Sequence, residues 1–169
     1  MAEEARAQGR PTAVADPGAL VARRSLVIRA TQDRIWEEIA SKERFAAWWG
    51  VETEVMKTAV LRWDAREGGW FENTGTYGGS PINFKGRIVV FDPPREATFE
   101  WTAPESGWTE PTYVSVRLRP LEAGTLAEIV HFGWEALGEA GPELHQVFER
   151  GWSLAELEAL KQRAEANAA

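Results

Sequence analysis

The C-terminal part of the sequence carries the strongest helical pattern. Between Pro142 and Lys161 apolar positions recur at helical spacing, and at about 100° per residue most of them fall within one arc of roughly 160°. The residues of this arc are Leu144, Val147, Phe148, Gly151, Trp152, Leu154 and Ala155. Proline is favoured at the first helical position, because its missing N–H would have no partner within the helix. The pattern therefore predicts one long helix over 142–161 with an apolar face that the rest of the chain covers.

Two leucines, Leu157 and Leu160, fall outside that arc. Either the helix bends near Gly151, or its last turns pack against something other than the sheet, and both interpretations stay open. Gly151 lies inside the apolar arc and has no side chain. It is therefore interpreted as the point at which the helix crosses closest to the sheet.

An alternation of apolar and polar residues predicts strands through the middle of the chain. It is clearest where Val114, Val116 and Leu118 alternate with polar neighbours. The other segments with strand character are 25–30, 59–63, 70–76, 84–91, 97–102 and 125–134. Phe99 and Trp101 then share one face of their strand, because side chains two apart point to the same side.

Turn and cap residues divide these segments. Thr31 and Ser41 each occupy the N-cap position of a short helix, and the second helix ends at Gly50, a natural left-handed stop. The stretch 64–69 carries hairpin-turn chemistry, whereas 75–81, with three glycines and a proline, is expected to form a loose loop.

This order of elements predicts an α+β fold. A first strand, two short helices and about six further strands precede the long helix, so the economical architecture is a curved antiparallel sheet of about six to seven strands wrapped around that helix. Residues 1–22 lack sustained periodicity and are expected to form a flexible tail, followed by a single domain over 23–165.

Composition narrows the function classes. The 169 residues include no cysteine, which excludes disulfides, thiol catalysis and cysteine-based zinc sites, and suits the cytoplasm. The formal charge of −7 argues against nucleic-acid binding, and no apolar run approaches the roughly 20 residues of a membrane span. Nine tryptophans are the outlier: they can form one core or bulky walls around a cavity.

Candidate chemistry is sparse. The two histidines, His131 and His145, could bind zinc or iron together with Glu128 or Glu149, but no metal or other cofactor is expected. His131 is interpreted as a hydrogen-bonded residue bordering the core rather than a general base. No nucleophile-elbow pattern or phosphate-binding glycine loop is present, so no catalytic residue is assigned.

Several motifs together point to a known superfamily. They are Ala30-Thr-Gln-Asp-Arg-Ile-Trp36, Phe45-Ala-Ala-Trp48-Trp49-Gly50, Asp64-Ala-Arg-Glu-Gly68-Gly69, Gly86-Arg-Ile through Asp92-Pro93-Pro94-Arg95, Phe99-Glu-Trp101, Gly124-Thr125 through His131-Phe-Gly-Trp134, and Gly151-Trp152. Over roughly Arg24 to Lys161 the chain resembles the START-like helix-grip (SRPBCC) superfamily. Within it, the chain is similar to the family related to the C-terminal domain of activators of the 90-kDa heat-shock protein ATPase.

The resemblance implies a binding function, because relatives on this fold bind lipids, sterols, polyketides and other apolar molecules. We therefore expect a non-enzymatic module that binds a hydrophobic small molecule in a cavity between the sheet and the C-terminal helix. The residues expected to line it are Trp48, Trp49, Trp63, Phe71, Arg87, Trp101, His131, Phe148, Gly151 and Trp152. Arg87 is the candidate anchoring charge, although a solvated strand arginine is the simpler interpretation.

Two other classes stay open. An enzyme of the polyketide cyclase or dehydratase type would need a polar residue inside the cavity, with His131 and Arg87 as candidates. A protein-interaction domain, with a chaperone or another protein as its partner, would instead present an exposed apolar patch.

Overall fold

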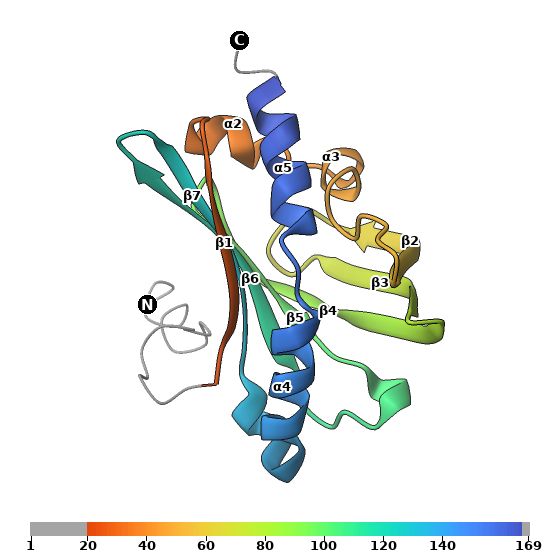
Figure 1. Ribbon diagram of the computed structural model, residues 1–169. Coiled ribbons are helices and arrows are strands. Elements are labelled where there is room, and N and C mark those ends of the chain that lie inside the picture. The colour runs from red at the N-terminus through yellow and green to blue at the C-terminus, as the bar shows by residue number, and fades with distance from the viewer. Residues whose placement is uncertain (1–19, 167–169) are drawn as a thin grey trace.

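The computed structural model describes residues 20–166. Figure 1 shows its helices, 3-10 helices (η) and strands. They are β1 (Ala22–Ile28), α2 (Gln32–Trp36), α3 (Lys42–Ala46), β2 (Met56–Trp63), β3 (Trp70–Tyr77), β4 (Ser80–Asp92), β5 (Glu96–Trp101), η1 (Pro104–Ser106), β6 (Thr112–Leu121), β7 (Gly124–Phe132), η2 (Trp134–Ala140), α4 (Gly141–Gly151) and α5 (Ala155–Ala166).

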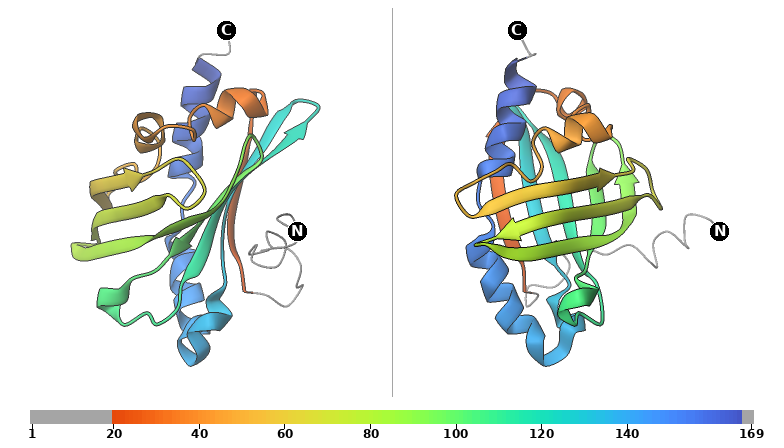
Figure 2. Two further views of the ribbon diagram at one scale, coloured as in Figure 1. Left: turned by 180° about the vertical axis from the view of Figure 1, so that it is seen from behind. Right: turned by 90° about the vertical axis from the view of Figure 1, so that its right-hand side faces the viewer.

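The seven strands form one antiparallel sheet in the order β1-β7-β6-β5-β4-β3-β2. The sheet curves strongly, and the two C-terminal helices lie along its concave side (Figure 2). The predicted α+β helix-grip fold with two short helices after the first strand is therefore confirmed. Most of the expected tail lies outside the described residues, but Ala22 already pairs with His131 in β1.

The two short helices begin where their caps predict. The Thr31 hydroxyl accepts a hydrogen bond from the Arg34 N–H at 3.2 Å, and Ser41 accepts one from the Arg44 N–H at 3.3 Å. After the second helix the chain turns at Gly50, whose φ of 63° suits glycine.

The single long helix expected over 142–161 is wrong, because the chain breaks it into α4 and α5. Trp152 has φ −64° and ψ 128°, which is extended backbone, and Ser153 Oγ then accepts a hydrogen bond from the Ala155 N–H at 3.1 Å. Leu157 and Leu160 belong to a second apolar face that α5 buries. A turn of the chain near Gly151 is thus the interpretation that holds, and the break lets α5 pack its own apolar face inward. The face expected to be covered over 142–155 is covered only in part, because Phe148 and Trp152 are half-buried whereas Val147 and Leu154 are exposed.

The loose loop expected over 75–81 is also wrong. Tyr77 pairs with Ser80, so Gly78 and Gly79 form a two-residue hairpin turn, with φ values of 56° and 83°. Positive φ at both central residues matches the right-handed twist of the flanking strands. Gly75 lies inside β3, where a Cβ would collide with the carbonyl oxygen of Lys57.

A buried carboxylate ties α5 to the small helices. Glu38 is 1% exposed and accepts hydrogen bonds from Arg163 Nε at 2.7 Å and from Arg34 Nη2 at 2.9 Å. Burial alone would raise the pKa of Glu38, but the two guanidinium groups outweigh it and lower the pKa. Over residues 20–166, no helix has both the length and the apolar character that crossing a membrane demands.

Candidate functional site

Most of the aromatic residues packed on the concave side of the sheet form two groups. The inner group is closed and consists of Phe45, Trp48, Trp49, Trp63, Phe71 and Phe99, each no more than 2% exposed. Its indole groups are anchored, because Trp48 Nε1 donates to the Glu38 carbonyl at 2.9 Å and Trp63 Nε1 donates to the Ile39 carbonyl at 2.8 Å. Phe45 and Trp63 stack with ring centres 4.0 Å apart. This group is ordinary, well-packed core.

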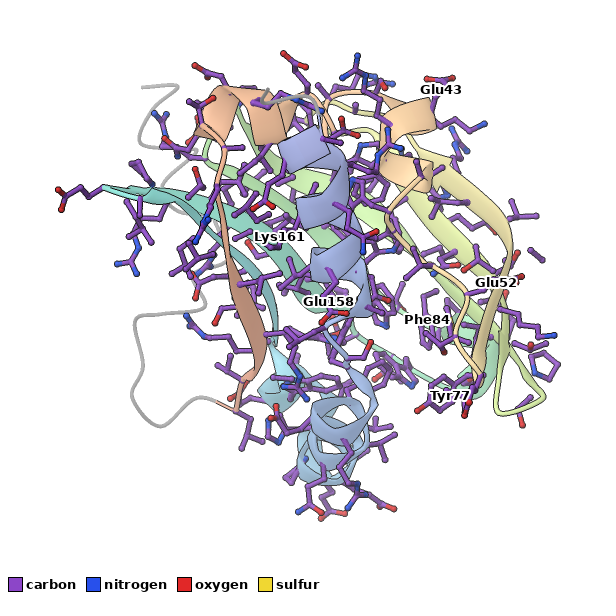
Figure 3. All side chains as sticks on the ribbon, turned by 45° about the horizontal axis from the view of Figure 1, so that its top comes forward. Glu43, Glu52, Tyr77, Phe84, Glu158 and Lys161 are labelled. Atoms are coloured by element: carbon purple, nitrogen blue, oxygen red, sulfur yellow. The ribbon has the colours of Figure 1, made fainter. Side chains whose placement is uncertain are left out.

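The second group, the end cluster, comes from separate parts of the chain. Its members are Phe84 of β4, Trp101 of β5, Trp108 of the β5–β6 loop, Phe148 of α4 and Trp152 of the α4–α5 link. Trp101 is buried, whereas the other four are only partly buried against the core. In Figure 3, Phe84 and Tyr77 lie on the β3–β4 hairpin side of the molecule, and Glu158 lies across from them on α5.

Ring contacts hold the end cluster together. Phe84 stacks on Trp101 with centroids 4.5 Å apart, and Trp101 lies 5.7 Å from Trp152. Phe148 approaches Phe84 at 5.8 Å and Trp108 at 5.9 Å, in edge-on arrangements. Rings from the sheet, a loop and a helix thus meet in one apolar region that is not fully closed, whereas the inner group is.

A hydrogen-bond chain under the end cluster fixes the state of His131. Trp152 Nε1–H donates to His131 Nδ1 at 3.1 Å, so Nδ1 is an acceptor and carries no proton. The proton is then on Nε2, which donates to Thr112 Oγ1 at 2.7 Å, and the Thr112 hydroxyl donates to the Trp101 carbonyl at 2.9 Å. Burial, with a smaller effect from the charge of His145, holds the pKa of His131 well below its usual range. His131 is therefore a neutral residue with both ring nitrogens engaged.

One buried polar atom of the end cluster has no such partner. The indole nitrogen of Trp101 is buried and makes no hydrogen bond to any of residues 20–166. A buried donor of this kind costs about 1–3 kcal/mol when it is left unsatisfied. The end cluster therefore combines incomplete apolar packing with an unused hydrogen-bond donor.

The structure brings together Trp101, His131, Phe148 and Trp152, four of the residues predicted to line one cavity. Trp49 connects the two groups, since its ring centre lies 5.9 Å from that of Trp152. Trp48, Trp63 and Phe71 belong to the closed inner group, although Phe71 stacks on Trp101 at 5.5 Å.

The structure does not bring Arg87 to the concave face. Its neighbours on the strand, Gly86 and Ile88, are buried, so the Arg87 side chain points outward and is exposed. There its guanidinium lies 4.6 Å from the ring centre of Trp70, and its backbone N–H donates to Glu100 Oε2 at 2.8 Å.

Gly151 is not at a close crossing with the sheet either. It is exposed at the end of α4, and a Cβ there would meet Tyr77 Oη at 3.6 Å, which is ordinary van der Waals contact. The α4–α5 break places this residue beside the β3–β4 hairpin instead of beneath the centre of the sheet.

Phe84 and Trp108 of the end cluster were not among the residues predicted from the sequence, and neither was Asn73, a buried polar residue of β3 that pairs with Phe84. Asn73 shares a strand face with Phe71, two residues earlier, and this spacing could have revealed it. Phe84 begins an apolar strand segment, but its neighbour across the sheet depends on the hairpin register. Trp108 lies in a loop, where periodicity predicts no orientation.

Within the described part of the chain, no three histidine, aspartate or glutamate side chains are grouped so that they could hold a metal ion. The ring of Trp134 lies between the two histidines, 4.1 Å from His131 and 6.0 Å from His145. The histidine pair considered from the sequence therefore belongs to the aromatic packing.

Comparisons with known proteins agree with this fold. The family model described as Activator of Hsp90 ATPase homolog 1-like protein matches residues 29–165. No curated protein matches the sequence.

Solved structures of bacterial proteins resemble most of the chain. Protein NE0264 from Nitrosomonas europaea is 14% identical with a TM-score of 0.66, covering 93% of this chain and 99% of that one. Protein CV1439 from Chromobacterium violaceum is 22% identical with a TM-score of 0.64, covering 86% and 96%. The AHSA1-like protein from Aeromonas hydrophila is 17% identical with a TM-score of 0.59, covering 88% and 94%. At these identities the likeness shows the fold alone.

Proposed function

The chain belongs to the family of Activator of Hsp90 ATPase homolog 1-like proteins, and from this premise we propose that it is a non-enzymatic binding protein for a hydrophobic small molecule. Membership of this family and the helix-grip fold support a ligand-binding or related domain in general. The finer proposal assigns the end cluster as the binding region.

The observation that carries the proposal is the contrast between the two aromatic groups. The inner rings are closed, but Phe84, Trp108, Phe148 and Trp152 remain partly exposed next to them. Covering apolar surface is favourable by about 25 cal/mol per Å², so a bound apolar molecule would complete the packing that the chain leaves unfinished. Rings from several segments also provide faces and edges, with which an aromatic ligand packs well.

Binding is favoured over catalysis by the state of the polar groups. A general base needs a lone pair within reach of its substrate, and His131 uses both ring nitrogens in protein hydrogen bonds. Arg87, the other candidate for an enzymatic role, is stacked on Trp70 on the outer face. Neither residue is placed to act on a molecule in the end cluster.

The proposal is tested with N-phenyl-1-naphthylamine, an uncharged dye that fluoresces in apolar sites. We expect saturable binding to the full chain, and at least a tenfold weaker dissociation constant for Trp108→Ala, which removes one wall of the end cluster. A tenfold change in the dissociation constant corresponds to about 1.4 kcal/mol of binding free energy. One aromatic contact, together with the apolar area that it buries, contributes an energy of this size.

Trp70→Ala is the matched control, because it removes a partly exposed indole from the opposite face of the sheet. It is expected to leave the dissociation constant within twofold. If the dye does not bind saturably, or if both variants weaken binding equally, the end cluster is not the binding region.

A further inference from the structure

Buried polar side chains on the described residues are satisfied almost without exception. They are Glu38, Asn73, Thr98, Thr112, Ser115, Thr125 and His131. All but one of them have a hydrogen bond to another residue of the chain. The exception is Asn73, which is 1% exposed and whose Oδ1 finds no donor within the described part of the protein. Such exceptions require an explanation, because native proteins pair nearly all buried polar groups.

Asn73 points toward the concave side of the sheet. The register of β3 against β4 is unbroken, so Asn73 faces the same way as Phe71, two residues earlier, which belongs to the core. Its direct cross-strand neighbours are Leu61 on β2 and Phe84 on β4, and both are partly buried apolar residues. A polar side chain thus stands between apolar ones on the face that the end cluster occupies.

Trp101 supplies the complementary group. Its buried indole nitrogen is a donor without an acceptor in the described chain, and its ring stacks on Phe84 at 4.5 Å with an angle of 23° between the planes. Phe84 is therefore flanked by Asn73, with an unused acceptor, and by Trp101, with an unused donor. The other unpartnered buried atoms of residues 20–166 belong to side chains that are partly exposed.

The unsatisfied Asn73 Oδ1 and Trp101 Nε1 each lower the free energy of unfolding. Leucine at position 73 would remove the first of these two costs. A ligand that satisfies both groups would offset the cost on binding. Charge narrows its chemistry further. The buried polar residues of the described chain include no lysine or arginine, and His131 is neutral. An anionic ligand would lose its hydration without gaining a counter-ion, which is strongly unfavourable.

We propose that the ligand of the end cluster is a neutral, flat aromatic compound with a hydroxyl or amide group that donates a hydrogen bond to Asn73 Oδ1 and accepts one from Trp101 Nε1. This inference rests on the proposed function, whose binding region it shares, and it adds the chemical class. It predicts that the end cluster binds phenol-like or amide-like compounds in preference to fatty acids and other carboxylates.

The test uses isothermal titration of the full chain with 2-naphthol and 2-methoxynaphthalene. Both compounds have a flat ring and an oxygen that accepts a hydrogen bond, but only the naphthol also donates one. Asn73→Leu is expected to weaken naphthol binding about tenfold and to change methoxynaphthalene binding less than twofold. The same substitution is expected to leave the melting temperature unchanged or higher, because it removes an unsatisfied buried group.

Trp101→Phe keeps an aromatic ring and removes the donor. It is therefore expected to raise the dissociation constants of both compounds by a similar factor. Thr98→Val is the control, since Thr98 is a buried polar residue bonded to Ser115 at 2.6 Å on the other face. It is expected to lower the melting temperature without affecting either dissociation constant. Binding of 2-naphthoate, the anionic analogue, is expected to be at least tenfold weaker than that of 2-naphthol.

The outcomes separate this inference from the proposed function. If 2-naphthoate binds as tightly as 2-naphthol, or if Asn73→Leu weakens both uncharged compounds equally, the inference is wrong while binding by the end cluster stands. A lower melting temperature for Asn73→Leu with unchanged binding would make Asn73 a structural residue and also overturn it. No saturable binding of any naphthalene compound would contradict both the inference and the proposed function.

Discussion

The indole Nε1–H of Trp152 donates a hydrogen bond to Nδ1 of His131, with 3.1 Å between the two nitrogens. Trp152 is the residue at which α4 ends in extended backbone, and His131 lies near the end of β7. This bond therefore joins the break between the helices to the sheet. It also requires a neutral imidazole, because a second ring N–H would face the indole donor.

The first prediction is that the protein loses stability in mild acid through His131. Its pKa in the folded state lies well below the unfolded value near 6.5, so the unfolded chain binds the additional proton. The free energy of unfolding should therefore fall as the pH drops below about 6.5, by up to roughly 2 kcal/mol at pH 5.0. Urea denaturation at pH 7.5, 6.5 and 5.0 measures it.

His131→Gln is the comparison variant, because glutamine keeps a donor and an acceptor without titrating. Burial raises the pKa of Glu156, so that group contributes stability at low pH that is lost as the pH rises, and it opposes the effect of His131. Glu156 contributes equally to both proteins, so its effect cancels when the free energy of unfolding of the variant is subtracted from that of the wild type at each pH. Identical pH profiles for the two proteins would show that His131 does not control the acid response.

The second prediction concerns Arg24, which holds the end of α4 against β1. Its guanidinium donates to the Trp152 carbonyl at 3.0 Å, to Glu149 Oε1 at 3.2 Å and to the Glu149 carbonyl. Arg24→Met should lower the free energy of unfolding by about 1–3 kcal/mol, because the last carbonyls of α4 lose their donors.

The neighbouring Arg23→Met is the control for that experiment. Arg23 pairs with Glu128 at 2.8 Å on the outer face with 42% of its side chain exposed, and such pairs contribute about 0–1 kcal/mol. Urea titrations that give equal losses for the two arginines would show that the α4 contacts carry no special stability.

The third prediction reverses what the sequence suggested for Gly151. Because this residue is exposed and helical, and a Cβ would have ordinary contact with Tyr77, Gly151→Ala should raise the free energy of unfolding by about 0.5–1 kcal/mol. Gly50→Ala should instead destabilise, because Gly50 has φ 63° and a Cβ would lie 2.6 Å from Thr58 Oγ1. Thermal melts of both variants measure the contrast, and a destabilising Gly151→Ala would contradict the exposed position of that residue.

The sequence predicts local features of this fold well. Thr31 and Ser41 reveal the helix starts because the cap interaction spans only three residues. The alternation around Val114 reveals β6 because Val114, Val116 and Leu118 are buried on one face of that strand. The helix break near Gly151 was visible only as two leucines off the main arc, and periodicity alone leaves two explanations for them.

The candidate site was harder to predict because its residues are joined by register and by loops. Arg87 is flanked by apolar residues in the sequence, but which side of β4 it faces follows from the pairing of that strand with β3. Trp108 contacts Phe84 and Phe148 from a loop, and no spacing rule brings these three together. Tryptophans of the closed core and of the end cluster also look alike in sequence, since burial depends on the tertiary neighbours.

The central claim is that the end cluster, and not the closed core, binds a neutral aromatic molecule. Each of the nine tryptophans contributes one indole N–H signal to a proton–nitrogen NMR spectrum, so one titration with 2-naphthol reports on every candidate at once. Single tryptophan-to-phenylalanine variants assign the signals. The account predicts saturable shifts for Trp101, Trp108 and Trp152, and unchanged signals for Trp48 and Trp63, whose indoles are bonded to backbone carbonyls. A spectrum that stays unchanged, or that shifts at Trp48, Trp63 and the outer-face Trp70 as much as at Trp101, would contradict it.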